Sequence, residues 1–341
     1  MTEKTRLRVV ARSDQRRPAH DDGMPPTPPP APAPADYPRL DRRMTVAAAA
    51  HRCVDAAFRH LLANVAPVLE SDDAEGIHQA RVALRRLRSA LALFRPAFAD
   101  AELERIADHA KWLATRLGPA RDMDVFAEEL LAPVLDGLPQ DRALTAFALA
   151  VQGERQRRRM VARRALRSRR FKIFIDATER WLARVIAPRL HAVGGRAPIG
   201  AALGDILAYA AERLDKRARG VAKRGRDFNS MPSDSRHDLR LALKKLRYAA
   251  EFFHGLFAKN AANIYIADLT RFQSGLGYLN DLATARKLST GVADSLSEAR
   301  AADMRYAGGL VLGWHGREAA RVEARLRKAW RRFQADPGFW T

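Results

Sequence analysis

The sequence of 341 residues contains a single cysteine, Cys53, which excludes an internal disulfide and favours a reducing compartment. No apolar run approaches the roughly 20 residues that a transmembrane helix needs. The pair Arg16-Arg17 is followed by Pro18-Ala-His-Asp-Asp, where an export signal would have an apolar stretch. These absences predict a cytoplasmic protein that neither crosses a membrane nor is exported.

Acidic residues are scarce relative to basic ones. The chain has 60 Lys and Arg against 39 Asp and Glu, a net charge of +21. Such an excess predicts a polyanionic partner: nucleic acid, polyphosphate or an anionic membrane surface. Aromatic residues make up only 7% of the chain, so few rings are available to stack on bases. No helix-turn-helix, zinc-finger or RNP signature is present, but a nucleic-acid-binding or nucleoid-associated protein stays an alternative interpretation.

Motifs for common cofactors are missing as well. The sequence has no Gly-x-x-x-x-Gly-Lys loop, no Gly-x-Gly-x-x-Gly after a strand, and no His-x-x-x-His or Cys-x-x-Cys pair. We therefore expect no cofactor, no bound metal and no enzymatic activity. No feature of the sequence predicts an oligomeric state.

A basic motif that begins at a histidine occurs twice in the chain. The two histidines are 159 positions apart, and this offset holds without a gap for more than forty residues. It pairs Phe94 with Phe253 and Asp122 with Asp281. The chain is therefore a tandem duplication of a unit of about 150 residues. The two copies read His78-Gln-Ala-Arg81-Val-Ala-Leu-Arg85-Arg86-Leu-Arg88 and His237-Asp-Leu-Arg240-Leu-Ala-Leu-Lys244-Lys245-Leu-Arg247.

The repeated motif is predicted to be helical, with one apolar and one basic face. Apolar residues recur at helical spacing from Ile77 to Phe94, so this face is expected to be buried. The adjoining face carries four basic residues in each copy, and Arg86 and Lys245 point further round the helix. Like charges at these spacings repel by a few tenths of a kcal/mol per pair, which favours an anion-binding face over a merely solvated one. The members of the basic face are His78, Arg81, Arg85 and Arg88 in the first copy and His237, Arg240, Lys244 and Arg247 in the second.

Helical periodicity extends over nearly all of the chain after residue 44, and no alternating strand pattern occurs. Residues 1–40 are predicted to be a disordered basic and Pro-rich arm, because Pro25 to Pro34 offers little apolar surface to bury. A Gly- and Pro-containing break at 193–200 divides the rest into helical bundles at 41–195 and 196–341. The simplest all-α arrangement is two similar bundles related by a pseudo-two-fold axis. Helices are expected at about 44–66, 73–95, 98–117, 122–136, 140–167, 172–190, 200–221, 234–254, 260–276, 280–296 and 299–335.

Three further features allow two interpretations each. The basic segments 154–170 and 317–332 either add charge to the anion site or are solvated helices. Asp122 and Asp124 could act as paired carboxylates, but Ala283 replaces the second in the other copy, so Asp122 and Asp281 are expected to cap helices after a shared Leu-Gly turn. His78 and His237 could share a metal, but their basic neighbours repel a cation.

The doubled His-x-x-Arg-x-x-x-(Arg/Lys)-(Arg/Lys)-Leu-Arg motif, with a downstream Leu-Gly-x-x-x-Asp, resembles the CHAD domain, the conserved histidine α-helical domain. The resemblance covers about residues 44–335, and no Glu-x-Glu-x-Lys start of a CYTH domain accompanies it. It implies two four-helix bundles around a basic channel that binds inorganic polyphosphate, and targeting to polyphosphate granules. The binding positions that it implies are His78, Arg81, Arg85, Arg86, Arg88, His237, Arg240, Lys244, Lys245 and Arg247.

Overall fold

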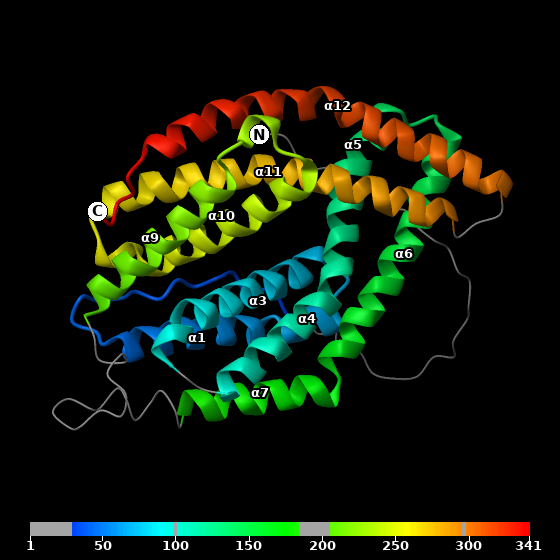
Figure 1. Cartoon of the computed structure of the whole chain (residues 1–341). Coiled ribbons are helices and arrows are strands. Elements are labelled where there is room, and N and C mark those ends of the chain that lie inside the picture. Colours follow the sequence, from blue (N-terminus) through cyan, green and yellow to red (C-terminus); the bar gives the residue numbers. More distant parts are fainter. Residues whose placement is uncertain (1–28, 99–100, 184–204, 295–297) are drawn as a thin grey trace, which may run out of the picture.

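The computed structural model describes residues 29–98, 101–183, 205–294 and 298–341, and within them all regular structure is helical (Figure 1). This confirms the predicted all-α class. Short 3₁₀ turns follow α3 and α10, and a π-helical turn, Phe126–Leu131, joins α4 to α5. The α-helices are α1 (Val46–Ala63), α2 (Val65–Glu70), α3 (Ala74–Phe94), α4 (Ala101–Val125), α5 (Ala132–Gly137), α6 (Arg142–Leu166), α7 (Arg169–Trp181), α9 (Ile206–Arg224), α10 (Ser233–Phe253), α11 (Lys259–Asp294) and α12 (Glu298–Ala335).

Side-chain caps determine where several helices begin. The Thr45 hydroxyl accepts a hydrogen bond from the amide of Ala48 at the start of α1. The Asp73 carboxylate accepts one from the amide of Glu75 at the start of α3. These oxygens satisfy amides that have no partner within the helix, so each helix has a defined first turn.

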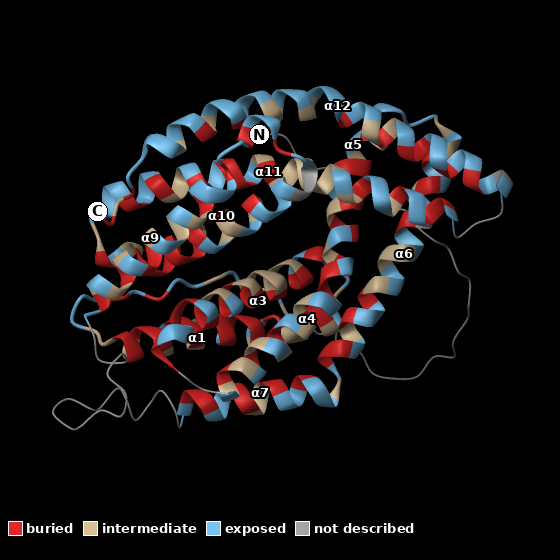
Figure 2. Cartoon of the chain, viewed as in Figure 1, coloured by how far each residue is buried: buried red, intermediate tan, exposed pale blue. Residues whose placement is uncertain are grey.

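The two halves of the chain each place one basic helix between two neighbours. In the first half α3 packs against α1 and α4, and in the second half α10 packs against α9 and α11. Figure 1 shows α1, α3 and α7 on one side of the molecule and α9 to α12 on the other, with α4–α5 and α6 reaching across. The buried faces of these helices turn toward one another (Figure 2).

One apolar core runs through both halves. The rings of Phe94 and Phe253, which are equivalent in the repeat, meet edge to face with centroids 5.9 Å apart. Phe94 also stacks on Tyr209 of α9. A second, smaller core lies where α6 meets the end of α11 and the start of α12, and it includes Phe126 and Phe147. Both halves therefore contribute side chains to each core.

The bounds of the basic helices agree with the sequence prediction. Helix α3 spans 74–94 and α10 spans 233–253, so the two match each other at the offset of 159. Their apolar faces are buried, with Leu84 and Leu243 both fully inaccessible. This burial sets the rotation of each helix about its axis and thereby directs its basic face.

The predicted breaks after Leu117 and Leu276 are wrong, because α4 and α11 continue through both positions. Gly118 is needed for contact between helices and not for a turn. A Cβ atom there would lie 3.0 Å from Nη1 of Arg81, which donates a hydrogen bond to the Ala114 carbonyl. Asp122 therefore lies inside a helix and does not cap one, and the same holds for Asp281.

The expectation of a disordered arm over residues 1–40 is corrected for its last part. Residues 29–40 pack against the helices, where Ala33 exchanges hydrogen bonds with Asn64 and Leu40 is buried. The burial of Leu40 and the hydrogen bonds between Ala33 and Asn64 hold this segment in place, although its Pro-rich composition did not predict such contacts. Residues 1–28 and the predicted break at 193–200 lie outside the described residues.

The arginines of α6 have structural partners. Asp124 is fully buried and accepts hydrogen bonds from Nε of Arg155 at 2.6 Å and from Nη2 of Arg159 at 2.9 Å. Arg163 donates to the carbonyls of Val68 and Ser71, which end α2. These three arginines therefore join α6 to α4 and α2, and they do not contribute to an anion site.

The second basic segment, 317–332, is more exposed. In its middle, Arg321 and Arg325 pair with Glu318 at 3.6 and 3.1 Å. These pairs follow the mixed-charge pattern of a solvated helix face, which supports the solvated interpretation for this part of α12. Within the described part of the chain, no helix combines the length and apolarity needed to cross a bilayer.

We expect Asp124→Asn to lower the free energy of unfolding by about 3 kcal/mol, because it leaves the buried Arg159 guanidinium without its counter-charge and the half-buried Arg155 with Glu128 alone. Urea unfolding followed by circular dichroism would measure this loss. Asp108→Asn, at an exposed position of the same helix, is the control and should change stability by less than about 0.5 kcal/mol. Equal stabilities for the two variants would contradict the structural role of Asp124.

Candidate anion-binding cavity

A cavity of about 550 Å³ lies between α3 and α4 of the first half and α10 and α11 of the second. Its wall has seven basic side chains and three acidic ones, so it carries a surplus of positive charge. The acidic members are Asp122, Glu129 and Asp281. The basic members are His78, Arg81, Arg85, Arg121, Arg240, Lys244 and Arg247.

The two repeated helices provide six of these basic residues through the same helical spacing. Positions 78, 81 and 85 of α3 and positions 240, 244 and 247 of α10 each fall on one face of their helix. All six are half-buried, since they lie at the edge of the apolar core. The predicted basic face is thus confirmed as a structural feature for these six residues.

Three of the cavity arginines are held by the protein itself, and one of them, Arg121, donates from Nη2 to Glu129 at 3.1 Å. Arg81 donates to the Ala114 carbonyl of α4 at 3.0 Å. Arg247 donates from Nε to the Gln273 side chain at 3.0 Å and from Nη1 to Glu251 at 2.8 Å. Their guanidinium groups are therefore fixed in orientation before any ligand arrives.

Arg85 and Lys244 have no hydrogen bond or ion pair to any other described residue. They are equivalent in the repeat and lie close together, because the Arg85 charge depresses the pKa of Lys244. Nε of Arg240 is also buried without a protein partner. Donors of this kind are available to an anion that enters the cavity.

Burial and crowding of like charges depress the pKa values of four cavity bases, which are His78, Arg81, Arg240 and Lys244. The pKa of Lys244 falls to about 7, mainly because of burial and then because of Arg240 and Arg85. Burial likewise lowers the pKa of His78, and the Arg121 charge lowers it further. A cavity that disfavours its own positive charges is stabilised when an anion enters it.

The acidic side chains offset only part of this charge. Asp122 lies close enough to Arg81, and Asp281 to Arg240, to raise the pKa of those arginines against the effect of burial. Burial raises the pKa of Asp281 itself. Asp281 also acts on Lys244, but neither Lys244 nor Arg85 forms an ion pair with a carboxylate of the described residues.

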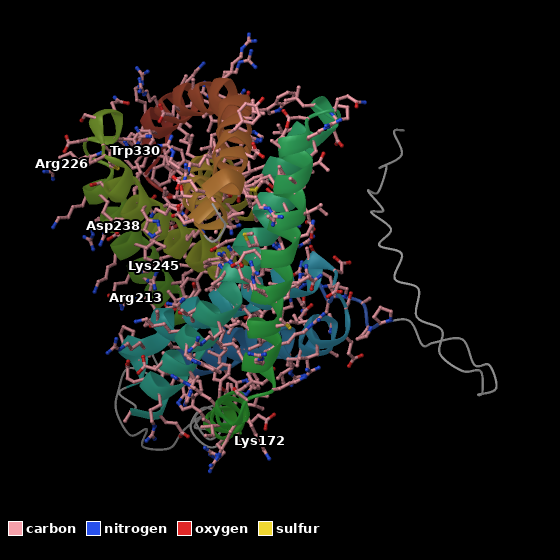
Figure 3. The ribbon with its side chains drawn as sticks, turned by 90° about the vertical axis from the view of Figure 1, so that its right-hand side faces the viewer. Lys172, Arg213, Arg226, Asp238, Lys245 and Trp330 are labelled. Atoms are coloured by element: carbon pink, nitrogen blue, oxygen red, sulfur yellow. The ribbon has the colours of Figure 1, made fainter. Side chains whose placement is uncertain are left out.

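Four predicted binding residues do not line this cavity. Arg88 and Lys245 are exposed, and Figure 3 shows Lys245 on the outer side of α10. His237 is exposed and lies with Arg240 on a small adjacent pocket, its Nδ1 3.5 Å from Asn280. Arg86 is buried on another side of α3, under the ring of Tyr37. The repeated motif therefore contains residues with different surroundings.

Arg121 is a cavity residue that the sequence analysis missed. It lies on α4, one residue before Asp122, and its equivalent in the second half is Asn280. Because this position is basic in one copy only, the repeat does not identify it. In the described part of the chain no three His, Cys, Asp or Glu side chains gather as metal ligands would.

The chain is similar in sequence to known proteins. A model of the CHAD domain matches residues 52–290. Two uncharacterized proteins of Mycobacterium tuberculosis, one from strain CDC 1551 / Oshkosh and one from strain ATCC 25618 / H37Rv, are each 30% identical over 217 residues. The match covers 60% of this chain but 39% of each relative, so the chain spans about two fifths of their length.

Two solved structures are similar in fold. The crystal structure of the CHAD domain from the plant Ricinus communis has a TM-score of 0.76 and 29% identity, and it covers 90% of this chain and 98% of its own. PptA from Streptomyces chartreusis has a TM-score of 0.60 at 17% identity, and it covers 84% of this chain and 99% of its own. The second likeness concerns the fold alone.

Proposed function

This chain belongs to the CHAD-domain family, and we propose that its cavity binds inorganic polyphosphate without catalysing a reaction on it. One observation carries the proposal: basic side chains from both halves converge on one cavity, and two of them, Arg85 and Lys244, form no hydrogen bond or ion pair with the described residues. The resemblance of the doubled motif to the CHAD domain implies the same ligand. The rest of the proposal follows from the chemistry of that ligand.

Polyphosphate is a narrow, flexible chain in which every unit carries a negative charge and no unit carries a base. A cavity that binds it needs closely spaced guanidinium and ammonium groups and no stacking platform. The cavity wall fits this description, since Tyr278 is its one aromatic side chain and seven basic groups surround the space. The Tyr278 hydroxyl is bonded to His315, which holds the ring against α12.

We also propose that the two halves are related by a pseudo-two-fold axis that passes between α3 and α10. Two pairs of equivalent residues support this arrangement: the rings of Phe94 and Phe253 touch, and Arg85 lies close enough to Lys244 to lower its pKa. A phosphate chain along such an axis would meet both copies of the motif. By the same resemblance, the protein would be cytoplasmic and associated with polyphosphate granules.

The proposed function predicts tight and strongly salt-dependent binding of polyphosphate. Titration calorimetry with chains of defined length at 50 and 200 mM salt should show affinity that falls by about tenfold or more, because several ionic contacts are screened. Duplex DNA should fail to displace long-chain polyphosphate at equal phosphate concentration, because a duplex is too wide for the cavity. Preferential binding of DNA would support the nucleic-acid alternative instead.

The absence of catalysis is tested separately. Prolonged incubation with polyphosphate and a divalent metal should release no more phosphate than a control without protein. Release that scales with protein concentration would overturn the binding-only proposal.

A further inference from the structure

Residues 29–43, here called the strap, lie against both halves of the molecule. The amide and carbonyl of Ala33 bond to the Asn64 side chain at the end of α1, each at 3.0 Å. Further along, Nε of Arg42 donates to the Leu256 carbonyl of the second half at 2.8 Å. In Figure 1 the strap, drawn in dark blue, runs along the gap between the halves before α1 begins.

The strap places Tyr37 directly over Arg86. The guanidinium carbon of Arg86 lies 4.1 Å from the centroid of the Tyr37 ring, within the range of a cation–π contact. Arg86 is only 1% exposed, and both of its Nη atoms are buried without a hydrogen-bond partner in the described protein. Tyr37 is 42% exposed, so its ring covers the buried Arg86 guanidinium on a side of the molecule that solvent reaches.

Arg86 is connected to the anion-binding cavity through Glu251. The Glu251 carboxylate accepts a hydrogen bond from Arg247, which lines the cavity, and the positive charge of Arg86 acts on the same carboxylate. Glu251 and Arg247 in turn act on the Tyr37 hydroxyl, whose pKa is raised by burial and by Glu251. Arg247 is thus hydrogen-bonded to Glu251, Arg86 lies against Tyr37, and electrostatic interactions couple these two pairs.

We propose that the strap is an intramolecular plug, and that Tyr37 occupies the place where a phosphate of a long chain would meet Arg86. The inference rests on the proposed function of the cavity. Glu251 balances one of the two positive charges of Arg86 and Arg247, so these three side chains together carry a net charge of about +1. This charge attracts an anion once the Tyr37 ring moves away. A polyphosphate chain that extends past Arg247 then competes with Tyr37, whereas a ligand of three phosphates stays inside the cavity.

Calorimetry on the full chain with Tyr37→Ala and Tyr37→Phe tests this competition. Loss of the ring should increase the affinity for long-chain polyphosphate by about two- to fivefold, the factor that one cation–π contact contributes. The affinity for tripolyphosphate should not change. Tyr37→Phe keeps the ring over Arg86 and should behave as the unaltered protein does.

Hydrogen exchange of the strap gives a second readout. The Ala33 amide should be protected in the free protein by its bond to Asn64, and saturation with long-chain polyphosphate should remove that protection, while tripolyphosphate should not. The plug would be wrong, and the proposed function untouched, if the unaltered protein, Tyr37→Ala and Tyr37→Phe bound long-chain polyphosphate with equal affinity and the Ala33 amide stayed protected in the complex. Failure of all three proteins to bind any polyphosphate would overturn the proposed function, and the plug with it.

Discussion

Replacing Arg85 and Lys244 together with glutamine should weaken the binding of long-chain polyphosphate by about 100-fold or more. These are the two cavity bases with no hydrogen-bond or ion-pair partner among the described residues, so their donors are free for a phosphate. A hydrogen bond to a charged group contributes about 1.5–3 kcal/mol, and two such bonds correspond to a loss of that size. Calorimetric titration of the purified variant measures the change.

The same helices offer a matched control. Arg88→Gln/Lys245→Gln removes one arginine from α3 and one lysine from α10, but both side chains are exposed and lie off the cavity wall. At pH 6, below the pKa of about 7 of Lys244, the change in net charge is nearly the same in both variants, so any general attraction between the protein and a polyanion weakens almost equally. The control should lose less than about fivefold, as expected for the loss of long-range attraction alone. Equal losses would assign binding to the overall charge of the protein and not to the cavity.

Thermal unfolding of the cavity variant separates a lost contact from a damaged fold. Arg85 and Lys244 repel each other in the unliganded cavity, so their removal should leave the melting temperature unchanged or raise it. A lower melting temperature would mean that the two side chains support the packing of α3 against α10, and the affinity could then not be interpreted as a contact energy.

The sequence alone was sufficient to predict the basic helices, because two separate signals agreed there. Apolar spacing predicted α3 and α10 to within a residue or two, and the duplication identified which polar positions recur. Six of the ten predicted binding residues line the cavity for this reason. The spacing of residues along a helix determines the side of the helix to which each side chain points. Positions 81, 85, 240 and 244 line the cavity because their side chains point to its side of α3 and α10.

Other parts of the site depend on contacts that periodicity does not contain. Gly118 suggested a turn in the sequence, but in the structure its small size admits the Arg81 side chain while α4 continues. Arg86 belongs to the repeated motif by sequence, yet the strap covers it. Tertiary contacts decided both cases, since a glycine or an arginine has the same local propensity whether or not a neighbour packs on it.

The binding of polyphosphate should depend steeply on pH through Lys244. Burial, with Arg240 and Arg85, holds the pKa of this lysine at about 7 in the free protein, so it is largely neutral at pH 9. A bound phosphate chain favours the charged form and moves the pKa back toward its ordinary value of roughly 10.4. The complex therefore binds a proton more tightly than the free protein does between these two values.

Affinity should consequently rise as the pH falls from 9 to 7, by up to about 50-fold if the pKa returns fully, and level off below about 7. In the free protein His78 titrates below this window, because burial lowers its pKa from the ordinary value. Lys244→Arg keeps the charge on a group that does not titrate here, so its affinity should be nearly constant over the window. Lys245→Arg, at the exposed neighbouring position, should retain the full pH dependence. A Lys244→Arg variant with the unaltered profile would show that another group takes up the proton, and Lys244 would then lie outside the contact made with phosphate.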